Sequence, residues 1–212
     1  MKHIRLWGMG ILVVLLVGAG LWGWWSLDLK WRPHTIKRDQ SEIAGILQGA
    51  GWVSPKLAGP KLYMISYRSC SDCIRFEEVE FPKLQAAGVD TRVIVIARAD
   101  LNGQAKSTPA ERATVAELWL NRDWRLFQRW AAVRPPDAWT APGIPPADGD
   151  AARTAVIGAG RMAVEALRPL LEHNGIRFAY PTLIWWDKKG VMRGCACEKA
   201  RSYANVEKEL GA

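Results

Sequence analysis

Two cysteines separated by two residues are the strongest chemical signal in this chain. Cys70 and Cys73 follow the apolar run 62–67 and stand where a helix is predicted to begin directly after a strand. A helix N-terminus offers unpaired N–H groups and a partial positive charge, which stabilise a thiolate, the reactive form of cysteine. The spacing therefore predicts a redox-active dithiol with Cys70 as its nucleophile. Half of a zinc site and a structural disulfide have the same pattern.

The elements around this pair are predicted to hold it at the end of a sheet. The apolar run 61–67 is typical of a strand, and the residues from Cys70 onward have the apolar spacing of a helix. Pro82 lacks an N–H group and must kink or restart that helix, and Gly88 caps it. The β-branched run 91–97 predicts a second strand buried on both faces. This β-α-β order places the cysteines at the carboxyl end of the first strand, where open α/β sheets have their sites.

The segment from about 100 to 175 is predicted to be a helical insertion. The residues 108–111 fit an N-cap, a first-turn proline and a reciprocal glutamate, and they predict a helix that continues towards Trp130. A second helical region over 151–173 should kink or split near 158–160 and near Pro169, because glycine and proline favour breaks in a helix.

The pattern returns to strands after this insertion. The runs 182–187 and 191–193, joined by a Lys-Lys-Gly turn, predict a β-hairpin, and a terminal helix is expected over 198–210. The complete order is β-α-β, helical insertion, β-β-α.

This order and three local motifs resemble the thioredoxin fold, and within it the catalytic domain of the periplasmic disulfide isomerases of the DsbC and DsbG type. The motifs are the Cys70–Cys73 pair after a strand, the segment 87–93 before the second strand, and the segment 174–182 before the hairpin. The resemblance covers residues 61–212. It implies an α/β, thioredoxin-like fold with a helical insertion.

The resemblance also implies roles for the residues around the dithiol. Cys70 attacks a substrate disulfide, and Cys73 resolves the mixed disulfide. Pro181 stands where the family has a cis-proline that faces the dithiol and shapes the docking groove, which Tyr180 and Thr182 flank. A cis X-Pro bond costs only about 0.5 to 1 kcal/mol over trans. The turned chain leaves the backbone of Tyr180 exposed, so that an extended substrate can pair with it as an added strand.

The chain departs from the family pattern at several places. Ser71 and Asp72, between the cysteines, are expected to tune the thiolate, and the Asp72 carboxylate should raise the thiol pKa by opposing the helix dipole. Met64 stands six residues before Cys70, where some relatives have a buried acid, so no proton relay through such an acid is expected. Residues 26–59 are too few for the dimerisation domain of the isomerases. A tethered monomer acting as a reductase or an oxidase is equally consistent.

A second pair, Cys195 and Cys197, follows the predicted hairpin, where the thioredoxin fold runs close to the active-site surface. Three interpretations are open. The pair could exchange electrons with Cys70 and Cys73, could be structural, or could join them as thiolate ligands for zinc or copper(I), which prefer soft ligands.

The uncharged run 6–25 predicts targeting to a membrane. As a helix rising about 1.5 Å per residue it would span the hydrocarbon core. The alternative is a cleaved signal peptide, with Val17 and Ala19 as the small residues before the cut. The four basic residues that follow the run argue against export under the positive-inside rule, whereas the dithiol chemistry favours export. We therefore expect a single-pass inner-membrane protein with a periplasmic catalytic domain.

These boundaries divide the chain into an anchor or signal peptide over 1–25, a tether over 26–59 and a thioredoxin-like domain over 60–212. The net charge is +8, but the bases are scattered among acids and form no stripe with interleaved aromatic residues. A nucleic-acid partner is therefore not expected. Dithiol exchange also requires neither a cofactor nor a metal.

The sequence as a whole predicts a membrane-anchored, extracytoplasmic thiol-disulfide oxidoreductase: a reductase, isomerase or oxidase of protein disulfides. Its expected partners are protein substrates with cysteines and an electron-transfer partner in the inner membrane. The alternative is a thioredoxin-fold metallochaperone or tethered assembly factor that binds metal through its four cysteines.

Overall fold

The computed structural model describes residues 15–25 and 31–212. In these ranges the N-terminal stretch is helical over 15–25, and none of the helices is both long and apolar enough to cross a bilayer. The predictions of a transmembrane helix over 6–25 and of a single-pass inner-membrane location are therefore wrong. Residues 6–14 of that run lie outside the described part of the chain.

The chain divides after Arg32 into two compact units, and the larger one, from Pro33 to Ala212, is built on one mixed sheet. The strands are β1 (His34–Thr35), β2 (Lys61–Ser66), β3 (Asp90–Val95), β4 (Thr182–Trp186) and β5 (Met192–Ala196). Their order in the sheet is β1-β5-β4-β2-β3. Strand β2 is parallel to β3, and the other neighbouring pairs are antiparallel. A β-α-β unit with an antiparallel hairpin beside its first strand is the connectivity of a thioredoxin-like fold.

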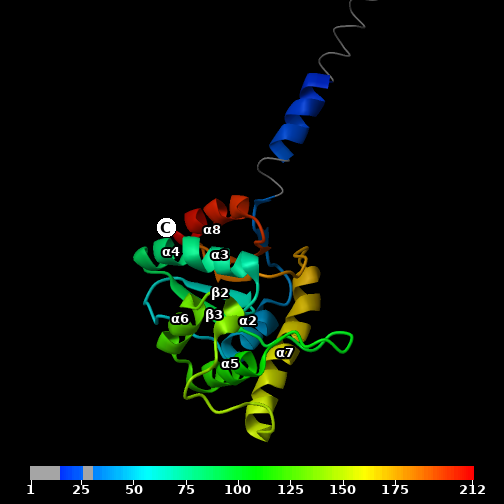
Figure 1. The fold of residues 1–212 in the computed structure, drawn as a ribbon. Helices are drawn as coiled ribbons and strands as arrows, with labels where there is room; N and C mark the ends of the chain where they lie inside the picture. Colours follow the sequence, from blue (N-terminus) through cyan, green and yellow to red (C-terminus); the bar gives the residue numbers. More distant parts are fainter. Residues whose placement is uncertain (1–14, 26–30) are drawn as a thin grey trace, which may run out of the picture. The chain divides into compact units, whose positions relative to one another are not determined.

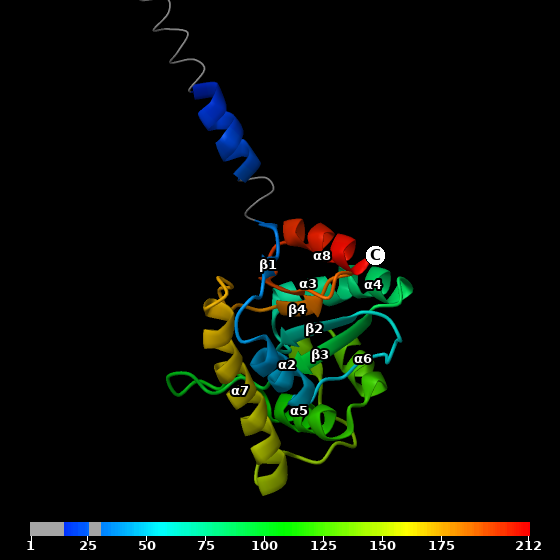
Figure 2. The same ribbon diagram turned by 180° about the vertical axis from the view of Figure 1, so that it is seen from behind.

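Helices cover both faces of this sheet (Figures 1 and 2). They are α2 (Gln40–Gly49), α3 (Ser71–Val79), α4 (Phe81–Ala86), α5 (Pro109–Asn121), α6 (Trp124–Ala132), α7 (Ala151–Glu172) and α8 (Tyr203–Leu210), with the 3-10 turns η2 (Pro136–Ala138) and η3 (Ala200–Ser202). Leu62 and Met64 of β2 share a core cluster with residues of α3, α5, α6 and α8, whereas Tyr63 and Ile65 share a second cluster with α2 and α7. Because both faces are covered, β2 is apolar throughout rather than alternating.

The insertion between β3 and β4 begins with two helices where one was predicted to continue towards Trp130. Helix α5 ends at Asn121, and its C-cap residue, Arg122, has a left-handed backbone with φ 52°. Helix α6 then restarts at Asp123, whose carboxylate accepts hydrogen bonds from the N–H groups of Arg125 and Leu126 at 2.8 and 3.1 Å. A capping carboxylate satisfies the first free N–H groups of a helix, so this position favours a new start.

Helix α7, in contrast, continues through the glycines that were predicted to kink or split it. A Cβ atom on Gly160 would lie 3.0 Å from Cζ2 of Trp119, on α5, and one on Gly51 would lie 2.3 Å from Cδ2 of the same ring. The indole N–H of Trp119 donates a hydrogen bond to the carbonyl of Val95 at 2.8 Å. The two glycines thus make room for a side chain that joins α5, α7 and the end of β3.

The segment 33–60 belongs to the larger unit and lies along both edges of the sheet. Strand β1 pairs with β5 at one edge, and Val53 forms a β-bridge with Val93 of β3 at the other. Between them, Ile43 and Leu47 of α2 are fully buried in the core.

We expect Gly51→Ala to destabilise the larger unit by about 2 kcal/mol, because the new methyl group would overlap the Trp119 ring and lie 2.7 Å from its Cα. Gly45→Ala, inside α2, is the matched control: no atom lies within 4 Å of its added Cβ, and helix propensity should stabilise it by up to about 1 kcal/mol. Urea unfolding of both variants measures the difference. Equal midpoints would contradict the close approach of Trp119.

Candidate active site

Cys70 and Cys73 form a disulfide at the start of α3, with Cα atoms 5.2 Å apart. Cys70 is the N-cap residue, and its sulfur accepts a hydrogen bond from the backbone N–H of Cys73 at 3.1 Å. Both side chains are buried, Cys73 completely. The helix therefore directs its free N–H groups and the positive end of its dipole at the Cys70 sulfur, which stabilises a thiolate when the bond is reduced.

The register of the sheet brings Pro181 to the end of the sheet where the Cys70–Cys73 disulfide follows β2. Thr182, the first residue of β4, pairs with Ile65 near the carboxyl end of β2. The Tyr180–Pro181 peptide bond just before it is cis. Within the described residues, neither the backbone N–H nor the C=O of Tyr180 has a hydrogen-bond partner. An unpaired backbone at this position can accept an extended segment of another chain.

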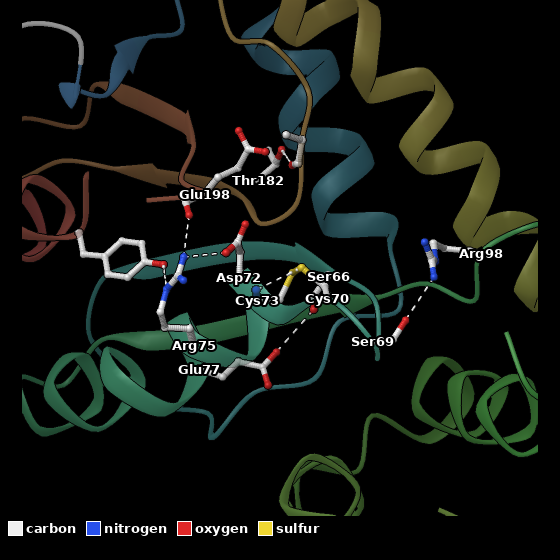
Figure 3. Close-up of a disulfide and its surroundings, with 12 residues drawn as sticks. Ser66, Ser69, Cys70, Asp72, Cys73, Arg75, Glu77, Arg98, Thr182 and Glu198 are labelled. Carbon is white, nitrogen blue, oxygen red and sulfur yellow. Dashed lines mark hydrogen bonds and ion pairs between the residues drawn. A yellow bond between two sulfur atoms is a disulfide. The ribbon is translucent and has the colours of Figure 1, made fainter. Parts of the chain in front are cut away.

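Aromatic side chains contact the ring of Tyr180. The ring of Tyr180 meets those of Tyr67 and Phe178 edge-on, with centroids 4.9 and 5.3 Å apart. Burial raises the pKa of the Tyr180 phenol. The guanidinium of Arg98 stacks 4.0 Å from the Tyr67 ring centroid and donates a hydrogen bond to Ser69 Oγ at 3.2 Å (Figure 3). The segment that leads into the disulfide thus presents apolar rings beside a fixed positive charge.

Arg75 offsets the charge of Asp72, the acid between the two cysteines (Figure 3). Its Nη2 donates to Asp72 Oδ1 and to the carbonyl oxygen of Glu198, each at 2.7 Å. Its Nε donates to the Tyr203 hydroxyl at 3.4 Å, and this bond, followed by the Asp72 charge, raises the pKa of Arg75. The negative charge that Asp72 was predicted to place beside Cys70 is therefore paired with a cation.

Glu77 is an acidic residue of α3 that the sequence reasoning missed. It is half-buried, and its Oε1 accepts a hydrogen bond from the Ser66 hydroxyl at 3.5 Å (Figure 3). Burial raises the pKa of Glu77 to about 7. Although Met64 cannot relay a proton, α3 therefore carries a carboxyl group that titrates near neutral pH. The sequence does contain a signal for Glu77. It lies four residues after Cys73, and residues at this spacing share one face of a helix.

A pocket of about 460 Å³ adjoins the residues that precede Cys70. Arg68 and Ser69 line one side, and the rings of Trp130 and Trp139 line others. Glu111 also lines it, and within the described residues its buried Oε1 has no hydrogen-bond partner. Burial raises the pKa of Glu111. The pocket thus combines apolar walls with an unpaired hydrogen-bonding group.

Cys195 and Cys197 form a second disulfide, with Cα atoms 5.2 Å apart. Cys195 lies on β5 opposite Leu183 of β4, and the backbone N–H of Cys197 donates to the carbonyl of Pro181 at 3.0 Å. The four cysteines of the chain are thus all paired. Among the described residues, no group of three or more His, Cys, Asp or Glu side chains is placed to hold a metal ion.

Comparisons with known proteins add little to this geometry. No model of a known protein family matches the sequence, and no curated protein matches it. Among solved structures, the chain is similar to BcfH from Salmonella enterica Typhimurium, with a TM-score of 0.45 and 13% identity over 100% of this chain and 97% of that chain. At this level of similarity, the strand order and the site residues must carry the functional inference.

The raised pKa of Glu77, about 7 against an ordinary 4.5, makes the stability of the domain depend on pH. The folded state favours the protonated acid, so its contribution is complete below about pH 4.5 and is lost as the pH rises through 7. We therefore expect the unfolding free energy of the wild type to fall, relative to Glu77→Gln, by on the order of 2 kcal/mol between pH 4.5 and 8. Denaturant titrations across this range measure it.

Glu165→Gln, at an exposed position of α7, is the control for this comparison. Its unfolding free energy should stay parallel to that of the wild type over the same range. A Glu77→Gln curve that is also parallel would show that the carboxyl group is not buried as the structure has it.

Proposed function

We propose that this chain is a thiol-disulfide oxidoreductase that acts on protein disulfides through Cys70 and Cys73. The observation that carries the proposal is the disulfide at the N-terminus of α3, placed at the same end of the sheet as the cis bond before Pro181 and the unpaired backbone of Tyr180. The nucleophile and the resolving thiol come from the start of α3, and the docking backbone comes from the segment before β4. A purely structural disulfide needs neither a helix N-terminus nor an open backbone beside it.

The chemistry follows from the positions of the two sulfurs. In the reduced protein, the Cys70 thiolate attacks one sulfur of a substrate disulfide, and the other substrate sulfur leaves as a thiolate. Cys73 then attacks the Cys70 sulfur, the second substrate thiolate leaves, and the original pair is a disulfide again. Two electrons and two protons pass to the substrate, and the reverse sequence oxidises it. Because the side chain of Cys73 is fully buried, it is better placed to resolve the mixed disulfide than to attack a substrate itself.

The surroundings of the pair support a polypeptide as the substrate. An extended segment can pair with the backbone of Tyr180 by two hydrogen bonds, as in strand addition to a sheet edge. The rings of Tyr67 and Phe178 contact the ring of Tyr180, and the pocket lined by Trp130 and Trp139 includes Arg68 and Ser69, the two residues before Cys70. Such surfaces accept apolar side chains next to a substrate cysteine. Nothing in the described residues favours the metal-binding alternative, which requires a cluster of ligands.

If Cys73 resolves the mixed disulfide, Cys73→Ala should leave Cys70 covalently joined to its substrates. When the reduced variant is mixed with a peptide that contains a disulfide, the Cys70 thiolate should displace one peptide sulfur and stay joined to the other. The adduct should appear by mass spectrometry and disappear on addition of dithiothreitol. Exchange should fall by at least about a thousandfold in Cys70→Ser, since a hydroxyl cannot replace the thiolate.

The double variant Cys70→Ser/Cys73→Ser is the control and should form no adduct. Adducts of equal amount in this control would place the reactive thiol elsewhere. Wild-type rates of exchange in Cys70→Ser would rule out the proposed function.

A further inference from the structure

The second disulfide is attached to the cis-proline segment of the candidate active site. The backbone N–H of Cys197 donates to the carbonyl oxygen of Pro181 at 3.0 Å, and Ala196, between the two cysteines, pairs with Thr182 of β4. One residue further back, Cys195 pairs with Leu183. The Cys195–Cys197 bond therefore lies beside the strand end that carries the docking backbone.

A second link joins this disulfide to the active-site helix. Arg75 of α3 donates one hydrogen bond to Asp72, within the C-x-x-C motif, and one to the carbonyl of Glu198, the residue after Cys197 (Figure 3). The two cysteine pairs are thus connected on one side through Pro181 and on the other through Arg75. The first link is one hydrogen bond, from Cys197 to Pro181, and the second is the pair of hydrogen bonds that Arg75 donates.

All four cysteines belong to a single core cluster, on the face of the sheet that α3 and α8 cover. Cys70 is 3% exposed, Cys195 is 6% exposed, and Cys73 and Cys197 are fully buried. The two pairs differ in whether a nearby group stabilises the thiolate form of a cysteine. Cys70 has a helix N-terminus to stabilise its thiolate, whereas Cys195 and Cys197 lie in and just after a strand, without such a group. The first pair is thus suited to attack and the second to be attacked.

A purely structural role explains the second pair poorly. The stabilisation that a disulfide gives by restricting the unfolded chain grows with the length of the loop that it closes. Cys195 and Cys197 are two residues apart, so they close nearly the shortest loop possible. Strand β5 is, moreover, already held between β4 and β1 by its ladders of hydrogen bonds.

We propose that Cys195–Cys197 is a second redox site, which accepts electrons from the Cys70–Cys73 dithiol of the same molecule; this rests on the proposed function of the first pair. The Cys70 thiolate attacks a sulfur of the Cys195–Cys197 bond, and the other sulfur leaves as a thiolate. Cys73 then attacks Cys70 and releases the second thiolate. One disulfide forms and one breaks, and two electrons and two protons pass from the first pair to the second. The reaction thus needs no other oxidant.

The full chain tests this inference through the kinetics of reduction. Dithiothreitol is added to the oxidised protein, thiols are blocked by alkylation at intervals, and mass spectrometry counts the label on each cysteine. Because groups held in one fold react faster than a dissolved thiol, Cys195 and Cys197 should be reduced about tenfold more slowly, or more, in Cys70→Ser/Cys73→Ser than in the wild type. Thermal unfolding of both proteins verifies that the variant is folded.

A trapping experiment gives a second and independent measurement. In Cys73→Ala, partial reduction should yield an internal disulfide between Cys70 and Cys195 or Cys197, found as joined peptides after proteolysis without reductant. Equal reduction rates in the two proteins would overturn the inference. So would a second pair that stays oxidised when the first is fully reduced, or an absence of joined peptides.

The two proposals fail in different ways. If the first pair exchanges with dithiothreitol and peptide substrates while Cys195 and Cys197 do not respond, only the relay is wrong. If Cys70 and Cys73 themselves do not exchange, the proposed function is wrong.

Discussion

The antiparallel position of β4 between β2 and β5 is the constraint on which the site depends. Because β4 runs against β2, its first residue, Thr182, lies where β2 ends, shortly before α3 begins. The next turn of the chain returns β5 to the same end of the sheet, with Cys195 and Cys197. Strands β2, β4 and β5 thus bring together segments that are more than 100 residues apart, and no single loop has to hold the site.

Packing around Trp119 is one of the contacts that fix the helical insertion to this sheet. Its ring lies against Gly51 and Gly160, and its N–H reaches the carbonyl of Val95, at the end of β3. Glycine in a helix is ordinarily a weak point, and that property misled the prediction for α7. Here Gly160 allows close contact between helices, and tertiary packing outweighs the local preference. A pattern within α7 alone cannot show that a tryptophan from α5 fills the space.

The sequence-based prediction succeeded where short segments determine the structure. The order of strands around Cys70, and the helix that begins at the motif, follow from local hydrophobic runs and from proline and glycine positions. What the sequence does not show is the charge balance of the site. The ion pair of Arg75 with Asp72 is local, but the bond from Arg75 to Glu198 joins residues 123 positions apart. The pKa of Glu77 likewise depends on burial, which only the folded chain defines.

The two edges of the sheet affect how readily one molecule can pair with another through its strands. An open strand edge is a template for unwanted pairing between molecules. Here the two residues of β1 cover β5 on one side, and Val53 bridges the middle of β3 on the other. Both covers come from the segment 33–60, which precedes β2 in the chain. Both rims of the sheet are thus partly covered, whereas the backbone of Tyr180 has no hydrogen-bond partner within the described residues and is the proposed place for pairing with a substrate strand.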